Sequence, residues 1–182
     1  MATYFSNHYT STGIEQTAVD AGFRVSAAIS HGRVRYKRAD ATGLFLTTDT
    51  VRMFTMQSGY RLLELWLSSD GYSGAGAINI GLHKSGNAHD GLVIDADLFA
   101  TAQTTSTIIT RTNMLSEGGS AAIAVATESA VNGLPLWQLA AMGAGTDTSD
   151  PGESWDFTIT PSTSHTTNNI LLTLEAYYTA GD

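Results

Sequence analysis

Four acidic side chains lie within ten residues of one another, around a Pro151-Gly152 turn. Carboxylate oxygens at this density could gather around a hard cation such as calcium, which takes six to eight oxygen ligands. The spacing is not that of an EF-hand, and an acidic turn in solvent, bent by the proline, gives the same pattern. We expect the solvated turn and no metal, with calcium as the weaker alternative at Asp147, Asp150, Glu153 and Asp156.

The five histidines do not form a known metal-binding motif, because they are far apart and none stands in a His-Glu-x-x-His pattern. His83, His89 and Asp90 share one polar loop and could converge with Asp95 or Asp97, although polar loops commonly carry such residues in solvent. The absence of cysteine excludes disulfides and thiolate nucleophiles. No nucleophile elbow, Walker loop or dinucleotide fingerprint is found. The sequence therefore predicts neither a cofactor nor an enzyme.

Aromatic side chains are a third candidate, because rings exposed on a β-sheet can stack against sugar rings. The same residue types are also common in protein cores and in subunit interfaces. All three tryptophans fall in patterned segments, which favours packing or an interface over a sugar platform. The aromatic residues concerned are Trp66, Trp137, Trp155, Tyr60, Tyr72, Tyr177 and Tyr178.

The charge is unevenly distributed along the chain. A formal net charge of −8 disfavours binding to nucleic acid or to an anionic membrane. Residues 1–61 carry seven basic and four acidic side chains, a charge of +3, whereas the remainder carries two basic and thirteen acidic ones, a charge of −11. The basic residues could dock onto an acidic partner, or they could lie on a solvated strand face.

The elements that would position these residues are mostly β-strands. Abundant Thr, Ser and Gly with only three prolines favour strands and turns. Val51–Met56 and Leu62–Leu67 are separated by Ser58-Gly59 and predict a hairpin. Period-two alternation and small apolar residues predict further strands at Arg33–Arg38, Ala77–Leu82, Thr105–Thr110, Ala121–Thr127, Trp155–Ile159 and Ile170–Tyr178.

Two segments predict helical structure. Asp95–Ala102 opens with acidic residues that complement a helix dipole, and we expect a short helical turn there. Leu134–Met142 has a proline near its start, a glycine after its end and apolar residues at helical spacing, which predicts one short helix. About eight short strands without βα units indicate an all-β, jelly-roll-like β-sandwich. We expect this domain at residues 33–182, after an extended N-terminal arm at residues 1–32.

Several of these segments, taken in order, form a recognisable series: Arg33–Arg38, Asp49–Phe54, Tyr60–Leu67, Ile78–Leu82, Asp95–Phe99, Leu136–Leu139, Asp150-Pro151-Gly152 and Leu172–Tyr178. The series resembles the capsid decoration proteins of tailed bacteriophages, also called cement or head-stabilising proteins. The likeness covers residues 33–178 as an order of short patterns, none of which is a signature motif. The arm before Arg33 and the polar stretches near residues 113–120 and 162–169 depart from the pattern.

The resemblance implies a structural virion protein that forms homotrimers on the outer surface of an expanded phage head. Such a protein stabilises the capsid lattice by clamping neighbouring copies of the major capsid protein, and it needs no cofactor or small-molecule substrate. The sequence shows no secretory signal and no membrane-spanning run. We therefore expect synthesis in the host bacterial cytoplasm and a final location on the capsid surface.

We expect the docking side to be formed by residues 1–32 and the basic strand that follows them. The basic residues assigned to it are Arg24, Arg33, Arg35, Lys37 and Arg38. The alternative is a carbohydrate- or receptor-binding β-sandwich module of a phage tail or fibre, which would contact host glycans through exposed aromatic residues.

Overall fold

The computed structural model describes residues 3–5, 34–72, 74–86, 91–115 and 133–180. Most of the expected N-terminal arm and the strand expected at Ala121–Thr127 lie outside the described residues. The boundary between arm and domain therefore stays a prediction.

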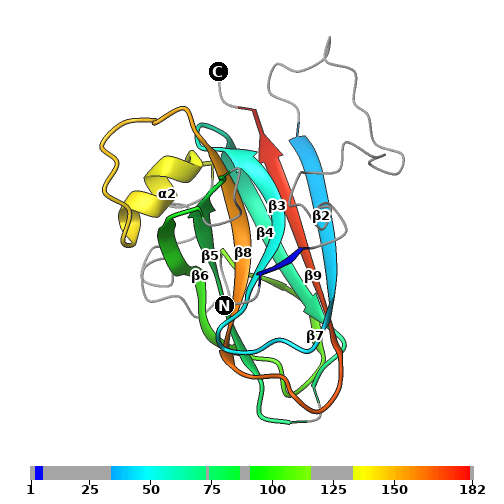
Figure 1. Ribbon diagram of the computed structural model, residues 1–182. Coiled ribbons are helices and arrows are strands. Elements are labelled where there is room, and N and C mark those ends of the chain that lie inside the picture. Colours follow the sequence, from blue (N-terminus) through cyan, green and yellow to red (C-terminus); the bar gives the residue numbers. More distant parts are fainter. Residues whose placement is uncertain (1–2, 6–33, 73, 87–90, 116–132, 181–182) are drawn as a thin grey trace.

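Among the described residues, eight strands form a two-sheet sandwich, as the sequence predicts (Figure 1). One sheet has the order β2-β9-β4-β7 and the other β3-β8-β5-β6, with β1 added in parallel to the edge of β3. All other neighbouring strands are antiparallel, and the two sheet orders are those of a jelly roll. The strands are β1 (Thr3–Phe5), β2 (Val34–Gly43), β3 (Thr50–Gln57), β4 (Arg61–Ser69), β5 (Ala77–Lys84), β6 (Val93–Thr104), β7 (Ile109–Asn113), β8 (Ser154–Thr163) and β9 (Ile170–Thr179).

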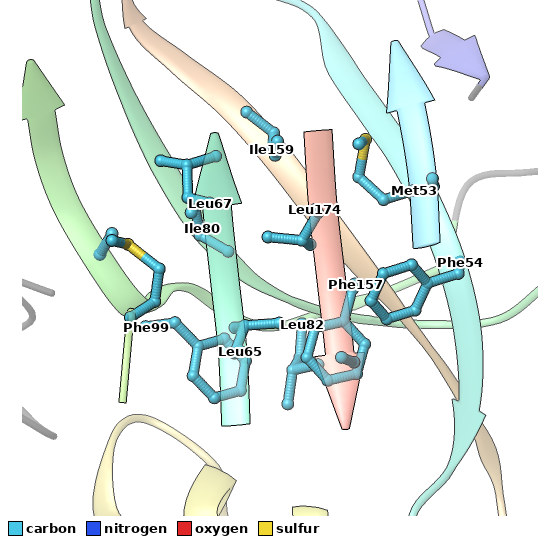
Figure 2. Packing of buried hydrophobic residues seen from close by; sticks show 14 of the residues in the cluster. Met53, Phe54, Leu65, Leu67, Ile80, Leu82, Phe99, Phe157, Ile159 and Leu174 are labelled. Atoms are coloured by element: carbon cyan, nitrogen blue, oxygen red, sulfur yellow. The ribbon is translucent and has the colours of Figure 1, made fainter. Parts of the chain in front are cut away.

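The core lies between the two sheets and follows from the alternation of apolar residues (Figure 2). Leu65 and Leu67 of β4 face inward from one sheet, and Ile80 and Leu82 of β5 face them from the other; all four are fully buried. Phe157 of β8 packs at the centre. Burial of each such side chain stabilises the fold by about 1.5–3 kcal/mol.

The expected hairpin of Val51–Met56 and Leu62–Leu67 is wrong, because β3 and β4 belong to different sheets. Both segments bury apolar side chains in one core, but from opposite sides. The connection between them is held by the neighbouring loop, where the Ser58 amide donates to the Glu153 carbonyl. Two inward-facing strands that are close in sequence can thus look like a hairpin without pairing.

The helical turn expected at Asp95–Ala102 is also wrong, because these residues lie in β6. The Asp95 carboxylate does not cap a helix; it accepts hydrogen bonds from the Asp97 and Ala144 amides. Residue 144, one of its two hydrogen-bond donors, is distant in sequence, so the pattern of residues around Asp95 does not reveal this hydrogen bond. Of the strand expected at Thr105–Thr110, only the last two residues are in β7.

The short helix expected at Leu134–Met142 is confirmed as α2 (Leu136–Met142), beginning after Pro135 and ending before Gly143 (Figure 1). It buries Leu136, Leu139 and Ala140. Within the part of the chain that the structure describes, no helix is long and apolar enough to cross a membrane.

Candidate interaction surface

The outward-facing side of the sheet β2-β9-β4-β7 carries three cross-strand rows of polar and aromatic side chains. The strand register places Tyr36 beside Tyr177, Arg38 beside Glu175 and Asp40 beside Thr173. On the other side of β9, Glu64, Trp66 and Ser68 complete these rows. Directly opposite side chains in an antiparallel sheet are in contact range, so the rows form one continuous surface.

Glu175 is the centre of this surface. Its carboxylate accepts a hydrogen bond from the Tyr36 hydroxyl at 2.7 Å, and it forms an ion pair with Arg111 at 3.1 Å. The Arg38 guanidinium lies 3.9 Å away and also pairs with Asp40 at 3.2 Å. Two cations from different strands therefore hold one carboxylate in place. We call Tyr36, Arg38, Trp66, Arg111, Glu175 and Tyr177 the outer-face cluster.

Arg111 covers the aromatic part of the cluster. Its guanidinium lies 4.5 Å from the centroid of the Trp66 ring and donates a hydrogen bond to the Tyr177 hydroxyl at 3.2 Å. The Arg111 backbone has a φ of 40°, a left-handed conformation that costs free energy for a non-glycine residue. The contacts with Trp66, Glu175 and Tyr177 favour one position of the Arg111 side chain over the cluster.

The ionisation of the cluster follows from these contacts. Burial and the adjacent Glu175 carboxylate raise the pKa of the Tyr36 hydroxyl well above its ordinary value. Hydrogen bonds to Asp40 and to Glu175 raise the pKa values of Arg38 and Arg111 respectively. Tyr36, Arg38 and Arg111 therefore keep their protons throughout the neutral range.

The predicted basic strand is only partly available for docking. Lys37 donates a hydrogen bond to the Thr55 carbonyl on β3 at 2.7 Å, and Arg38 belongs to the outer-face cluster. Arg35 is half-buried and has no ion-pair partner among the described residues. Arg24 and Arg33 lie outside the described residues.

The aromatic residues considered for a sugar platform do not lie on one face. Trp155, Tyr72 and Tyr178 are buried, and Trp137 packs against the core. Tyr60 stacks on Tyr178 with ring centroids 5.4 Å apart. Only Trp66 and Tyr177 reach the outer-face cluster, where Tyr36 joins them at 5.1 Å from Tyr177.

The acidic turn does not bring its four carboxylates together around one point. Asp150 accepts hydrogen bonds from the Ser58 hydroxyl and the Gly152 amide, and Glu153 pairs with Lys84 at 2.8 Å. Asp156 forms a buried ion pair with Arg52. Among the described residues, no three His, Asp or Glu side chains are grouped closely enough to hold a metal ion. His89 and Asp90 are outside this set.

Two histidines instead serve as buried hydrogen-bonding groups. His83 Nδ1 lies 2.8 Å from the Thr158 hydroxyl, and burial lowers the pKa of His83 to about 4. His165 is fully buried, and burial also lowers its pKa. Both are therefore neutral at pH 7.

His165 belongs to a network that joins the four loops at one end of the sandwich, which we call the loop end. Its Nε2 lies 2.8 Å from the Thr105 hydroxyl, and its amide donates to the Phe45 carbonyl at 2.7 Å. The Tyr72 hydroxyl accepts hydrogen bonds from the amides of residues 166 and 167. The loops β2–β3, β4–β5, β6–β7 and β8–β9 are thereby fixed relative to one another.

The loop end also exposes large apolar side chains. Leu44 and Leu46 are 42% and 45% exposed, and Ile108 is 70% exposed. Exposed aliphatic side chains on loops held in one geometry are typical of surfaces that bind another protein. The sequence did not indicate them, because isolated leucines in a loop have no periodic pattern.

No protein-family model matches the sequence, and no curated protein matches it. Among solved structures, a chain in the capsid of Ralstonia phage GP4 is similar at 14% identity with a TM-score of 0.53, over 100% of this chain and 99% of that one. A chain in the capsid asymmetric unit of cyanophage Pam1 shows 16% identity and a TM-score of 0.46, over 90% and 98% of the two chains. The GP4 likeness shows a shared fold.

Proposed function

We propose that the chain is a phage capsid decoration protein, a structural virion component that binds the outer surface of the head and stabilises the capsid lattice. The observation that carries this proposal is the likeness to the GP4 capsid chain over the full length of both chains. A shared module would match over part of the length; here the whole jelly roll is shared. The order of short patterns along residues 33–178, which resembles the decoration proteins of tailed bacteriophages, also supports the proposal.

The surface chemistry supports a binding role. Apart from Glu175, the outer-face cluster is composed of Tyr, Trp and Arg, the residues most enriched at the centres of protein interfaces. The loop end offers exposed aliphatic side chains on fixed loops. A surface whose geometry is set before binding loses less conformational entropy when it docks.

For the docking side we propose residues 1–32 together with the basic residues Arg24, Arg33, Arg35, Lys37 and Arg38. Lys37 and Arg38 already hold Thr55 and Glu175 within the domain, so we assign them to fixing β2 rather than to the first contact. Arg24, Arg33 and Arg35 are then the residues that meet the major capsid protein. Self-association as a homotrimer would place three such docking sides on one site of the lattice.

Binding that favours the expanded head stabilises it by mass action, because each bound copy lowers the free energy of that state alone. The first test is therefore the solution mass by light scattering, followed by sedimentation of the same sample with expanded and with unexpanded heads. We expect a trimer that pellets with expanded heads. A monomer that stays in the supernatant with both would refute the proposal.

The docking side is tested by a charge-removing variant, Arg24→Gln/Arg33→Gln/Arg35→Gln. We expect weaker pelleting with expanded heads and an unchanged melting temperature. The matched control is Lys84→Gln, which removes a positive charge on β5 and should pellet as the unaltered chain does. Equal pelleting of the triple variant would show that these side chains do not dock, while leaving the decoration role open to the loop end.

A second candidate function is the binding of a host carbohydrate by a tail or fibre module. The observation that favours it is the outer-face cluster, with Tyr36 37% exposed and a hollow lined by Ser68, Ser69, Asp70, Leu171 and Thr173 on the same sheet. Arg111 covers Trp66, which leaves less ring surface for a sugar. A glycan array discriminates the two functions: binding that is lost in Tyr36→Ala would support the carbohydrate role.

A further inference from the structure

The N-terminal strand β1 occupies the edge of β3 through a short parallel pairing. Thr3, Tyr4 and Phe5 lie beside Thr50, Val51 and Arg52 in register. An exposed edge is a template for pairing with any extended chain, so proteins cover it. Here the cover is a three-residue strand, and residues 6–33 separate it from β2 along the chain.

Beyond the residues that pair with β1, strand β3 is contacted by the other sheet. The Lys37 ammonium donates to the Thr55 carbonyl, three residues beyond Arg52, and so brings β2 of the other sheet next to this edge. The three residues of β3 that pair with β1 thus lie between the β2–β3 loop and the position where Lys37 contacts Thr55.

The contact between Lys37 and Thr55 also sets the distance that residues 6–33 must span between β1 and β2. Strands β2 and β3 are joined by the short segment 44–49 and run in opposite directions, and Lys37 contacts Thr55, so Val34 lies roughly 20 Å, or about six residue rises, from the end of β1. Residues 6–33 number 28 and can extend to about 95 Å. About seven extended residues would connect β1 to β2 within one chain.

We infer that β1 is an exchanged strand: in the assembled oligomer, residues 3–5 of one copy pair with residues 50–52 of a neighbouring copy. The pairing at the acceptor is the same in either arrangement, because the backbone contacts do not depend on which chain supplies the strand. The length of residues 6–33 permits the exchange, and the exchange links subunits without a new interface. The inference rests on the proposed self-association and not on capsid binding.

The test uses the absence of cysteine from the full chain, so that any introduced pair reports one contact. Thr3→Cys and Thr50→Cys are made as separate variants, mixed in equal amounts, unfolded, refolded together and mildly oxidised. Adjacent strand positions lie at a separation that a disulfide can bridge. In random exchange about a quarter of the strand contacts pair the two cysteines, and each gives a covalent dimer.

Thr3→Cys mixed with Thr110→Cys is the control for random collision, because Thr110 is exposed on β7, in the other sheet. The double variant Thr3→Cys/Thr50→Cys is oxidised in parallel. Exchange predicts covalent dimers in the mixture of Thr3→Cys with Thr50→Cys and none in the control mixture. In the double variant it predicts disulfides between different chains. The reduced double variant should have the same melting temperature as the unaltered chain, which would show that the two substitutions leave the fold intact.

A double variant that closes its disulfide within one chain, with no dimer in the mixture, would overturn the exchange and place β1 on its own domain. Absence of the disulfide in both samples would overturn it as well, since β1 would then pair with no β3. Neither readout involves phage heads. Failure of the exchange is thus distinguishable from failure of capsid binding, which the sedimentation assay reports.

Discussion

The network at the loop end contains one fully buried side-chain hydrogen bond, between Thr105 and His165, that a single substitution can remove. Thr105→Val replaces the hydroxyl by a methyl group of similar size and leaves His165 Nε2 without its partner at 2.8 Å. The backbone bonds of residue 105, to Tyr72 and Gly76, do not involve the side chain and should persist. The substitution therefore isolates the contribution of one hydroxyl.

The magnitude follows from the burial of both groups. Thr105 and His165 are each 0% exposed, so water cannot replace the lost bond without opening the loops. Leaving a buried polar group unsatisfied costs about 1–3 kcal/mol of the free energy of unfolding. For a domain of this length that corresponds to a fall of about 2–12 °C in melting temperature.

Urea unfolding, followed by tryptophan fluorescence, measures the effect, because Trp155 is fully buried in the core and reports the loss of packing. The matched control is Thr110→Val on the exposed surface of β7, which should change the free energy of unfolding by less than about 0.5 kcal/mol. A Thr105→Val effect as small as that of the control would refute the argument, because the hydrogen bond between Thr105 and His165 would then not hold the β6–β7 and β8–β9 loops together.

Three further predictions concern the cluster, a buried histidine and a close backbone approach. Glu175→Gln should lower the pKa of the Tyr36 hydroxyl, because the carboxylate helps to raise it; absorbance titration against Tyr36→Phe measures the difference. Since burial lowers the pKa of His83 from 6.5 to about 4, the unfolded state binds its proton more tightly, and the free energy of unfolding should fall as pH decreases through this interval. Urea titrations at pH 7 and pH 5 should show a smaller fall for His83→Gln. Gly81→Ala should disrupt the fold, because the added Cβ would overlap the backbone of residues 95 and 96, whereas Gly152→Ala, in open space at a φ of 66°, should cost about 1 kcal/mol by urea unfolding.

The strands of the core could be predicted because their pattern is local. Ile78, Ile80 and Leu82 alternate with residues that face away from the core, and this alternation alone defines a half-buried strand. Pairing is not local. Strands β3 and β4 are neighbours in sequence but join different sheets, while β3 pairs with β8 about a hundred residues away. The alternation of residues shows which face of a strand is apolar, but it does not show which other strand pairs with it.

The surface sites were less predictable for the same reason. The sequence indicated Trp66 and Tyr177 as aromatic candidates, but it gave no reason to place Arg111 over Trp66 or to connect both through Glu175. These residues come from three strands, and their contact depends on the jelly-roll order. The error at Asp95 has a similar origin, since its hydrogen-bond partner follows α2 almost fifty residues later.

The fold also changes the meaning of the uneven charge. The jelly roll places β2 beside β9 and β3 beside β8, so strands from the basic first third of the chain lie against strands from the acidic last third. Arg38 accordingly pairs with Glu175, and Arg52 forms its buried ion pair with Asp156. These basic side chains therefore pair with acidic residues of the same chain and contribute less to binding an acidic partner. Removing one member of the buried pair would leave the other charge buried and unpaired, which would lower the free energy of unfolding.

The positive charge left for a partner is therefore smaller than the sequence total suggests. If Arg24, Arg33 and Arg35 carry the docking contact, few exposed ion pairs form, and binding to expanded heads should weaken only modestly between low and physiological salt. A steep loss of binding over that interval would mean that the outer-face cluster opens and that Arg38 and Arg111 exchange Glu175 for carboxylates of the partner. Sedimentation with heads at two salt concentrations, repeated with Glu175→Gln, distinguishes these two modes of docking.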